Sequence, residues 1–275
     1  MVNPSNTIGL IAGGGQFPLL FAEAAGKKGI QVHAAAYVNE AAKELEHRVA
    51  SIQWLHLGQV GRLLSFFRKQ GISQAVMMGS VKKTRLFTDI RPDLKAMAFI
   101  AKMGHTHDDS VLTAFANLLE GEGIVIRPST WLLPELISPR GCWTARKPGS
   151  GEKKDIRTGW RMAKEIGRLD IGQCVVVSNG TVLAVEAADG TDATIRRGAA
   201  LSKRGAVVVK RSKPGQDLRF DLPSSGVETI ETMHQSGASL LVLEAGKSLS
   251  FDRDQMVALA DRYKISILAM DDHQF

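Results

Sequence analysis

The chain has 275 residues, 44% of them hydrophobic and 23% charged, a composition that excludes a disordered or fibrous protein. Its formal net charge of +7 favours an anionic partner (a nucleic acid, an anionic membrane surface or a phosphorylated small molecule), and the dispersed basic residues make nucleic acid the weakest of these. Cys142 and Cys174 lack CxxC spacing, which argues against a disulfide framework or zinc site and fits a reducing cytoplasm, and the sequence predicts neither a signal peptide nor a transmembrane helix.

Short apolar runs alternate with helical patterns through the first half of the chain. Strands are predicted over residues 8–12, 32–38, 52–57, 75–78 and 124–126, and helices over 18–28, 59–69, 92–103 and 110–120. This alternation is typical of βαβ units around a parallel sheet. We therefore predict a Rossmann-like α/β domain over residues 1–140.

The Gly-, Pro- and Lys-rich stretch "SPRGCWTARKPGSGEKK" interrupts the pattern and predicts a linker over residues 141–154. A second α/β domain, with a mixed sheet, is predicted over residues 155–275, and we expect it to be the catalytic one. Its helices are expected at 155–168, 192–201, 227–235 and 253–264, and its strands at 173–178, 181–187, 206–209, 239–243 and 265–269. Asn179-Gly180 predicts a hairpin with a type I′ turn.

The glycine run of "IGLIAGGGQFPLLF" follows the first strand, and Pro18 suits the start of the next helix. Such a loop can approach an anion closely, with the free N–H groups of the helix pointing at it, or it can be only a tight strand-to-helix turn. Gly13, Gly15 and Pro18 do not complete the GxGxxG fingerprint, and no GK[ST] follows, which argues against a nicotinamide cofactor or a Walker A loop.

Gly79 and Ser80 end another strand and precede three basic residues, Lys82, Lys83 and Arg85. Loops at the carboxyl ends of strands line the ligand crevice of open α/β sheets, so these residues are candidates for an anion-binding edge. A solvated basic loop is the alternative, and composition alone favours it.

Carboxylates follow the strand that ends near Glu186, in the segment "AVEAADGTDA". Glu186, Asp189, Thr191 and Asp192 offer oxygen ligands of the kind that Mg²⁺ prefers. The same residues can instead form a turn and cap the next helix.

The densest charged cluster is "KRSKPGQDLRFDLPSSG", residues 210–226. Lys210, Lys213 and Arg219 are suited to phosphoryl oxygens, and Asp217 and Asp221 to a metal or a water molecule. Hydrolysis of a phosphoric anhydride needs that combination, because its catalysis is mostly positioning and charge neutralisation. A self-neutralising charged loop remains the alternative. No GxSxG nucleophile motif supports a covalent mechanism.

Five motifs together ("GLIAGGGQFP", "HDDSVL", "IGRLDIGQ", "VLAVEAADGTDATIRR" and "QDLRFDLPSSG") resemble the LpxI-type UDP-2,3-diacylglucosamine pyrophosphatases of lipid A biosynthesis, over nearly the whole chain. The resemblance implies an Mg²⁺-dependent hydrolase that splits UDP-2,3-diacylglucosamine into UMP and 2,3-diacylglucosamine 1-phosphate (lipid X), with water attacking the β-phosphorus. It also implies two domains that hold the lipid between them, a homodimer and a Gram-negative source.

Carried over by motif, Asp221 becomes the first candidate for the essential carboxylate and Asp217 the second. The metal ligands expected are Asp221, Glu186 and Asp192. Gln173 and Thr191 are expected to bind substrate. The segments that match the first domain's side of the cleft are expected to bind it as well, and they contain Gly13, Gly14, Gly15, Gln16, Gly79 and Ser80. The segment "GSVKKTR" lacks the Arg-Pro that the family pattern places after Gly79, so a role tied to that pair is not carried over.

We therefore expect a cytoplasmic enzyme, peripheral at the inner membrane, whose positive charge suits an anionic lipid surface. The alternative is a non-catalytic regulatory protein that binds nucleotide sugars. Nucleic-acid binding is not expected.

Overall fold

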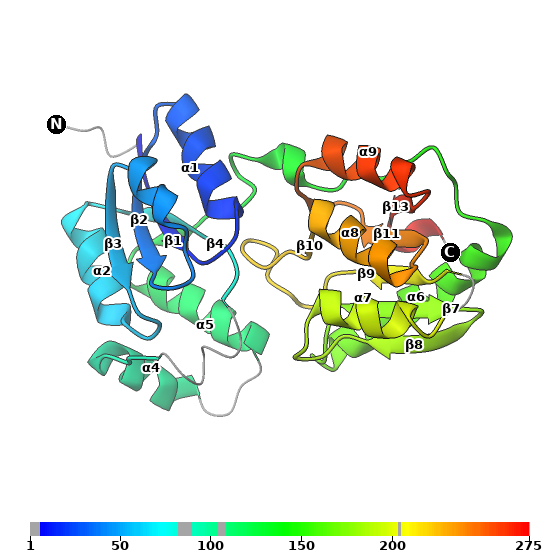
Figure 1. Ribbon diagram of the computed structural model, residues 1–275. Coiled ribbons are helices and arrows are strands. Elements are labelled where there is room, and N and C mark those ends of the chain that lie inside the picture. Colours follow the sequence, from blue (N-terminus) through cyan, green and yellow to red (C-terminus); the bar gives the residue numbers. More distant parts are fainter. Residues whose placement is uncertain (1–5, 82–89, 104–107, 203–204, 275) are drawn as a thin grey trace. The chain divides into compact units, whose positions relative to one another are not determined.

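The computed structural model describes residues 6–81, 90–103, 108–202 and 205–274 (Figure 1). The chain divides into two units: unit 1 comprises Met1–Pro134 and Asp217–Asp221, and unit 2 comprises Glu135–Gln216 and Leu222–Phe275. A five-residue segment from the second half of the chain thus belongs to the unit built by the first half.

Unit 1 contains a five-stranded parallel sheet in the order β3-β2-β1-β4-β5, which confirms the predicted Rossmann-like parallel sheet. Residues of β1 and β2 are almost continuously buried, as expected for parallel strands covered on both faces. The strands are β1 (Thr7–Ala12), β2 (Gln31–Tyr37), β3 (Ser51–Leu55), β4 (Gln74–Met78) and β5 (Val125–Ile126).

The helices of unit 1 are α1 (Phe17–Lys27), α2 (Val60–Lys69), α4 (Leu94–Met103) and α5 (Asp108–Gly121), with a 3₁₀ turn at Lys43–His47. Leu63 and Phe67 of α2 and Leu119 of α5 pack in one core with Ile11 of β1. Phe220, from the inserted segment, packs against the same core. The apolar side chain of that segment therefore completes unit 1.

Unit 2 is built on a six-stranded sheet in the order β6-β13-β11-β9-β7-β8, and its mixed strand directions confirm the predicted mixed sheet. β9, β11 and β13 run parallel, and β6 and β7 run antiparallel to their neighbours. The strands are β6 (Gly141–Cys142), β7 (Cys174–Ser178), β8 (Thr181–Val185), β9 (Val207–Lys210), β11 (Leu240–Glu244) and β13 (Ser266–Met270). A separate parallel pair, β10 (Ser224–Ser225) and β12 (Leu249–Ser250), was not predicted.

Helices cover both faces of this sheet. Alternate residues of β7 show the division, because Val175 packs in a core with Trp160 of α6 (Ser150–Arg168), whereas Val176 packs in another core with Ile195 of α7 (Thr191–Ala199). The second core also receives α8 (Val227–Ser236) and α9 (Arg253–Arg262). 3₁₀ turns lie at Pro134–Leu136 and Asp272–Gln274. None of the helices in the described ranges has the length and hydropathy needed to cross a bilayer.

The segment 141–154, for which we predicted a linker, lies within unit 2 and carries regular structure. β6 pairs with β13, and α6 begins at Ser150, five residues before the predicted start. Glu152 explains that start, because its Oε2 accepts a hydrogen bond from the Gly149 N–H at 2.8 Å. The division between the units falls at 134/135.

The Asn179-Gly180 hairpin has the geometry that its sequence predicts. φ is +52° at Asn179 and +75° at Gly180, and the antiparallel strands β7 and β8 flank the turn. The buried carboxylate of Asp155 accepts hydrogen bonds from both backbone N–H groups of the turn. The first helix of unit 2 therefore fixes its first hairpin.

We expect Gly180→Ala to lower the free energy of unfolding by about 1–2 kcal/mol, because an L-residue is strained at a positive φ. The new Cβ would meet only Lys154 Cε, at 3.5 Å, so backbone strain is the main cause. Gly151→Ala, in the first turn of α6 with open space around it, is the control and should be neutral or stabilising. Urea unfolding measures both; equal effects of the two changes would contradict the expectation.

Candidate functional site

In unit 1, the loops that follow β1 and β4 are bound to each other. Gly13 N–H donates to Met78 O (2.9 Å), and Gly14 and Ser80 exchange backbone hydrogen bonds of 2.7 and 3.0 Å. A Cβ on Gly13 would lie 2.6 Å from Ser80 O, and one on Gly79 would lie 2.7 Å from Gly13 C. The glycines at 13 and 79 are therefore required by the close approach of two backbones.

This geometry corresponds to the tight-turn interpretation for Gly13 and Gly14, whose N–H groups are engaged within the protein. Gly15, with φ of +86°, and Gln16 are the exposed residues of the loop. The loop follows β1, and the strand order reverses between β1 and its neighbour β4; open α/β sheets bind ligands at such a point. Gly15 and Gln16 are thus the loop residues best placed for a ligand.

The inserted segment Asp217–Asp221 lies at the same edge of the sheet. Ser129, three residues beyond the end of β5, donates its backbone N–H to Arg219 O at 2.6 Å. Because β5 is parallel to β4 and β1, their carboxyl ends share one edge. Asp221, which was predicted to lie in the second domain, therefore belongs to unit 1 and lies in the segment at the carboxyl edge of its sheet.

Asp217 and Arg219 form a tight pair within that segment. The Arg219 guanidinium donates to both carboxylate oxygens of Asp217, at 2.7–3.1 Å, and its Nη1 pairs with Glu120 at 2.6 Å. Hydrogen bonds from Arg219 hold the pKa of Asp217 below its usual value. Arg219, predicted to bind substrate, thus bridges two carboxylates, and Asp217 is engaged with it. Asp221 closes the turn by donating its N–H to Asp217 O at 3.1 Å.

In unit 2, polar residues gather at the edge formed by the carboxyl ends of β8, β9, β11 and β13. Glu186 follows β8, Arg211 and Ser212 follow β9, Glu244 ends β11, and Asp272 lies just beyond β13. None of Arg211, Ser212, Glu244 and Asp272 was predicted as a site residue. Their shared position at strand ends is the signal that could have identified them.

Arg211 is the centre of this edge, and only 4% of it is exposed. It pairs with Glu244 (3.4 Å) and Asp272 (3.2 Å), and its Cζ lies 4.5 Å from the ring centroid of Trp160. Trp160 Nε1 donates to Asp272 at 2.6 Å, and the hydrogen bonds of Trp160 and Arg211 lower the pKa of Asp272. Arg211 Nε and Gln173 Oε1 are buried without a hydrogen-bond partner among the described residues, so polar capacity remains at this edge.

Glu186, one of the two predicted metal ligands of unit 2, has structural partners. Glu186, 7% exposed, accepts hydrogen bonds from Thr191 Oγ1 (2.9 Å) and Gln173 N (3.2 Å), and Asp192 lies in the first turn of α7. This is the geometry of a turn joined to a helix start. No group of three or more His, Cys, Asp or Glu side chains suited to a metal occurs within the described part of the chain.

The predicted cations of unit 2 are also paired. Lys210, buried at the end of β9, donates to Ser224 O at 2.6 Å, and Lys213 pairs with Asp170 at 2.6 Å. The basic residues Lys82, Lys83 and Arg85 lie outside the described residues.

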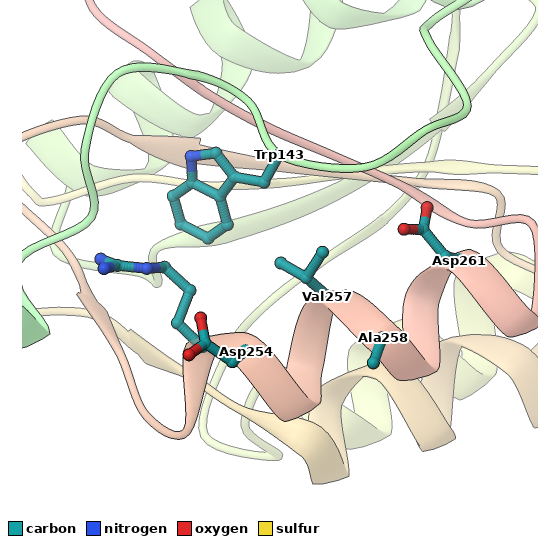
Figure 2. Close-up of a pocket in the computed structure, with 6 residues that line it drawn as sticks. Trp143, Asp254, Val257, Ala258 and Asp261 are labelled. Carbon is teal, nitrogen blue, oxygen red and sulfur yellow. The ribbon is translucent and has the colours of Figure 1, made fainter.

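A cleft of about 500 Å³ lies elsewhere in unit 2, between Trp143 and α9. Figure 2 shows Trp143 beside the helix that carries Asp254, Val257, Ala258 and Asp261. Asp261 Oδ1 accepts the Ala145 N–H at 2.8 Å, so this carboxylate of the cleft holds the loop that contains Ala145. No predicted site residue lines this cleft.

Two family models cover almost the whole chain: the LpxI N-terminal domain matches residues 7–136 and the LpxI C-terminal domain matches residues 139–268. The chain belongs to the LpxI family. The UDP-2,3-diacylglucosamine pyrophosphatase LpxI of Caulobacter vibrioides is 34% identical in an alignment of 278 positions, which covers 96% of this chain and 97% of that protein. The resemblance seen in the motifs is confirmed.

Solved structures show only a distant likeness. The biotin carboxylase domain of Hydrogenobacter thermophilus 2-oxoglutarate carboxylase is 16% identical, with a TM-score of 0.27, over 64% of this chain and 35% of that one. Phosphoribosylglycinamide synthetase from Anaerococcus prevotii is 11% identical, with a TM-score of 0.27, over 72% and 43%. The chain thus spans less than half the length of either protein, and neither likeness carries an argument.

Proposed function

We propose that this chain hydrolyses the pyrophosphate of UDP-2,3-diacylglucosamine, in lipid A biosynthesis, to UMP and 2,3-diacylglucosamine 1-phosphate. The observation that carries this proposal is the 34% sequence identity, over nearly the full length of the chain, to a UDP-2,3-diacylglucosamine pyrophosphatase. The place of Asp221 at the carboxyl edge of a Rossmann-like parallel sheet, where open α/β sheets bind ligands, supports it.

In the proposed mechanism, Asp221 is the essential carboxylate, and it orients or deprotonates the water that attacks the β-phosphorus. The pyrophosphate bond to the UMP oxygen breaks, and the new P–O bond gives the sugar 1-phosphate. Asp217 supports Asp221, because its side chain holds Arg219 and its carbonyl accepts the Asp221 N–H. Hydrolysis of this kind depends on positioning and charge neutralisation.

Mg²⁺ belongs to the proposal, with Asp221 as its best-suited ligand. Mg²⁺ is usually held by one or two carboxylates together with the substrate's phosphate oxygens, so a preassembled protein cage is not required. Glu186 fits a ligand role less well, because both of its oxygens accept hydrogen bonds within the protein. When bound, the ion would neutralise charge on the pyrophosphate.

The substrate's acyl chains place it at a lipid surface, and the net charge of +7 suits an anionic one. We therefore propose peripheral membrane contact on the cytoplasmic side. The homodimer that the family resemblance implies stays a prediction.

Incubation of the purified protein with UDP-2,3-diacylglucosamine tests the function. We expect UMP and lipid X to appear with Mg²⁺ and to be abolished by EDTA. In H₂¹⁸O, attack at the β-phosphorus places the label in lipid X, whereas label in UMP would mean attack at the α-phosphorus.

Binding of the substrate without release of UMP would contradict the proposal and favour the non-catalytic nucleotide-sugar-binding alternative. Activity that is unchanged by EDTA would remove the metal from it. A homologous pyrophosphatase assayed in parallel is the control for the substrate preparation.

A further inference from the structure

The turn that carries Asp221 is attached to unit 1 by the two residues just before it. Phe220 packs against the unit 1 core, and Arg219 O accepts the Ser129 N–H at 2.6 Å. These contacts fix where the segment lies. They leave open what fixes the conformation of the turn itself.

Glu120 supplies that restraint from the last turn of α5. Its Oε1 lies 2.6 Å from Arg219 Nη1, while the remaining donors of the same guanidinium hold Asp217. A planar guanidinium that is shared between two carboxylates has its orientation fixed by both. Asp217 O in turn accepts the backbone N–H groups of Phe220 (3.3 Å) and Asp221 (3.1 Å). A continuous set of contacts therefore links Glu120 to the backbone of Asp221.

We propose that Glu120 is a positioning residue for the Asp221 carboxylate. The proposal rests on the role proposed above for Asp221. Glu120 does not touch the reacting groups in this scheme; it acts through Arg219 and Asp217. It is encoded 101 positions before Asp221, in the stretch matched by the N-terminal family model, whereas Asp221 lies in the stretch matched by the C-terminal one.

Glu120→Gln tests the proposal in the full-length protein, because it keeps the size of the side chain and removes its charge. The control is Glu122→Gln, two residues on, whose carboxylate pairs with Lys95 and Arg68 of unit 1 and, among the described residues, forms no ion pair with the turn. We expect Glu120→Gln to lower kcat about three- to tenfold with KM changed less than twofold, since a small misplacement of a reacting group lowers kcat. Glu122→Gln should leave both constants unchanged.

Coupling to Arg219 distinguishes positioning from a general loss of structure. In an Arg219→Gln background, Glu120→Gln should lower kcat no further, because the pair is already broken. Salt gives a second signature: Glu120 and Arg219 are about one-third exposed, so NaCl should lower the kcat of the unchanged protein towards that of Glu120→Gln and should affect the variant less.

Amide hydrogen exchange of the peptide that contains residues 217–222 provides a readout that needs no activity. We expect faster exchange in Glu120→Gln and unchanged exchange in Glu122→Gln. Unchanged exchange and kcat in Glu120→Gln, or equal losses in the two variants, would overturn the proposal. If the unchanged protein released no UMP, the proposed function would fail, and the exchange result would still decide whether Glu120 restrains the turn.

Discussion

Asp221→Asn is expected to lower kcat for UMP release by about 10²–10⁴-fold, the range usual for loss of a general base, while the affinity for UDP-2,3-diacylglucosamine stays close to that of the unchanged protein. The amide keeps the size of the side chain but is a poor base and a weak metal ligand. Because the backbone N–H of Asp221 makes the turn's hydrogen bond to Asp217 O, the substitution leaves that bond intact. Single-turnover assays and equilibrium binding of the substrate measure the two effects separately.

Asp217→Asn is the matched comparison, in the same turn. It weakens the hydrogen bonds to Arg219, and we expect it to lower kcat about tenfold, because it displaces the turn but keeps the Asp221 carboxylate itself. A folded Asp221→Asn variant that keeps most of its activity would refute the role of Asp221. Loss of activity in Asp217→Asn alone would exchange the roles of the two aspartates.

Glu244→Ala is expected to lower the free energy of unfolding by about 3–5 kcal/mol, because it removes the buried carboxylate of an ion pair and leaves the buried Arg211 only partly compensated. Glu244 is 3% exposed and receives hydrogen bonds from Ser212 N (2.9 Å) and Ser212 Oγ (2.6 Å) as well as from Arg211. The substitution leaves the two Ser212 donors without this partner, and Asp272 becomes the remaining carboxylate that pairs with Arg211.

Lys247→Ala is the control, because Lys247 pairs with the same carboxylate at 3.3 Å but its side chain is 52% exposed. We expect it to cost less than about 1 kcal/mol. The double variant Arg211→Met, Glu244→Leu should regain part of the loss, since an apolar pair needs no compensation. Guanidinium unfolding measures all three, and a similar cost for Glu244→Ala and Lys247→Ala would contradict the importance of the buried pair.

Local patterns were sufficient to predict the parts of the fold that depend on neighbouring residues. The parallel sheet of unit 1 follows from alternating apolar runs and helical patterns, and the hairpin at Asn179-Gly180 follows from the positive φ that both residues tolerate. The start of α6 was misplaced, because Gly149, Ser150 and Gly151 are typical of a linker and conceal the cap that Glu152 makes.

The site was harder to predict, because its contacts join residues that are far apart in sequence. The charges of residues 210–226 are visible in the sequence, but the partners of each charge are not. Arg211 is buried and stacks over the Trp160 ring, whereas Arg219 pairs with Glu120, 99 positions earlier. Nor does the sequence show that positions 13 and 79 require glycine because the backbones of their two loops approach each other closely. Whether the predicted residues bind substrate stays a prediction.

The segment Asp217–Asp221, which belongs to unit 1, limits how the gene can evolve by recombination. The two family domains meet in sequence near residues 136–139, yet a break there separates Phe220 from the core that it helps to fill. Recombination that exchanged one domain for that of a distant relative would pack the segment 217–221 of one protein against the unit 1 core of another. The two halves are therefore expected to be inherited together, with changes around Glu120 accompanied by changes at Arg219 and Phe220.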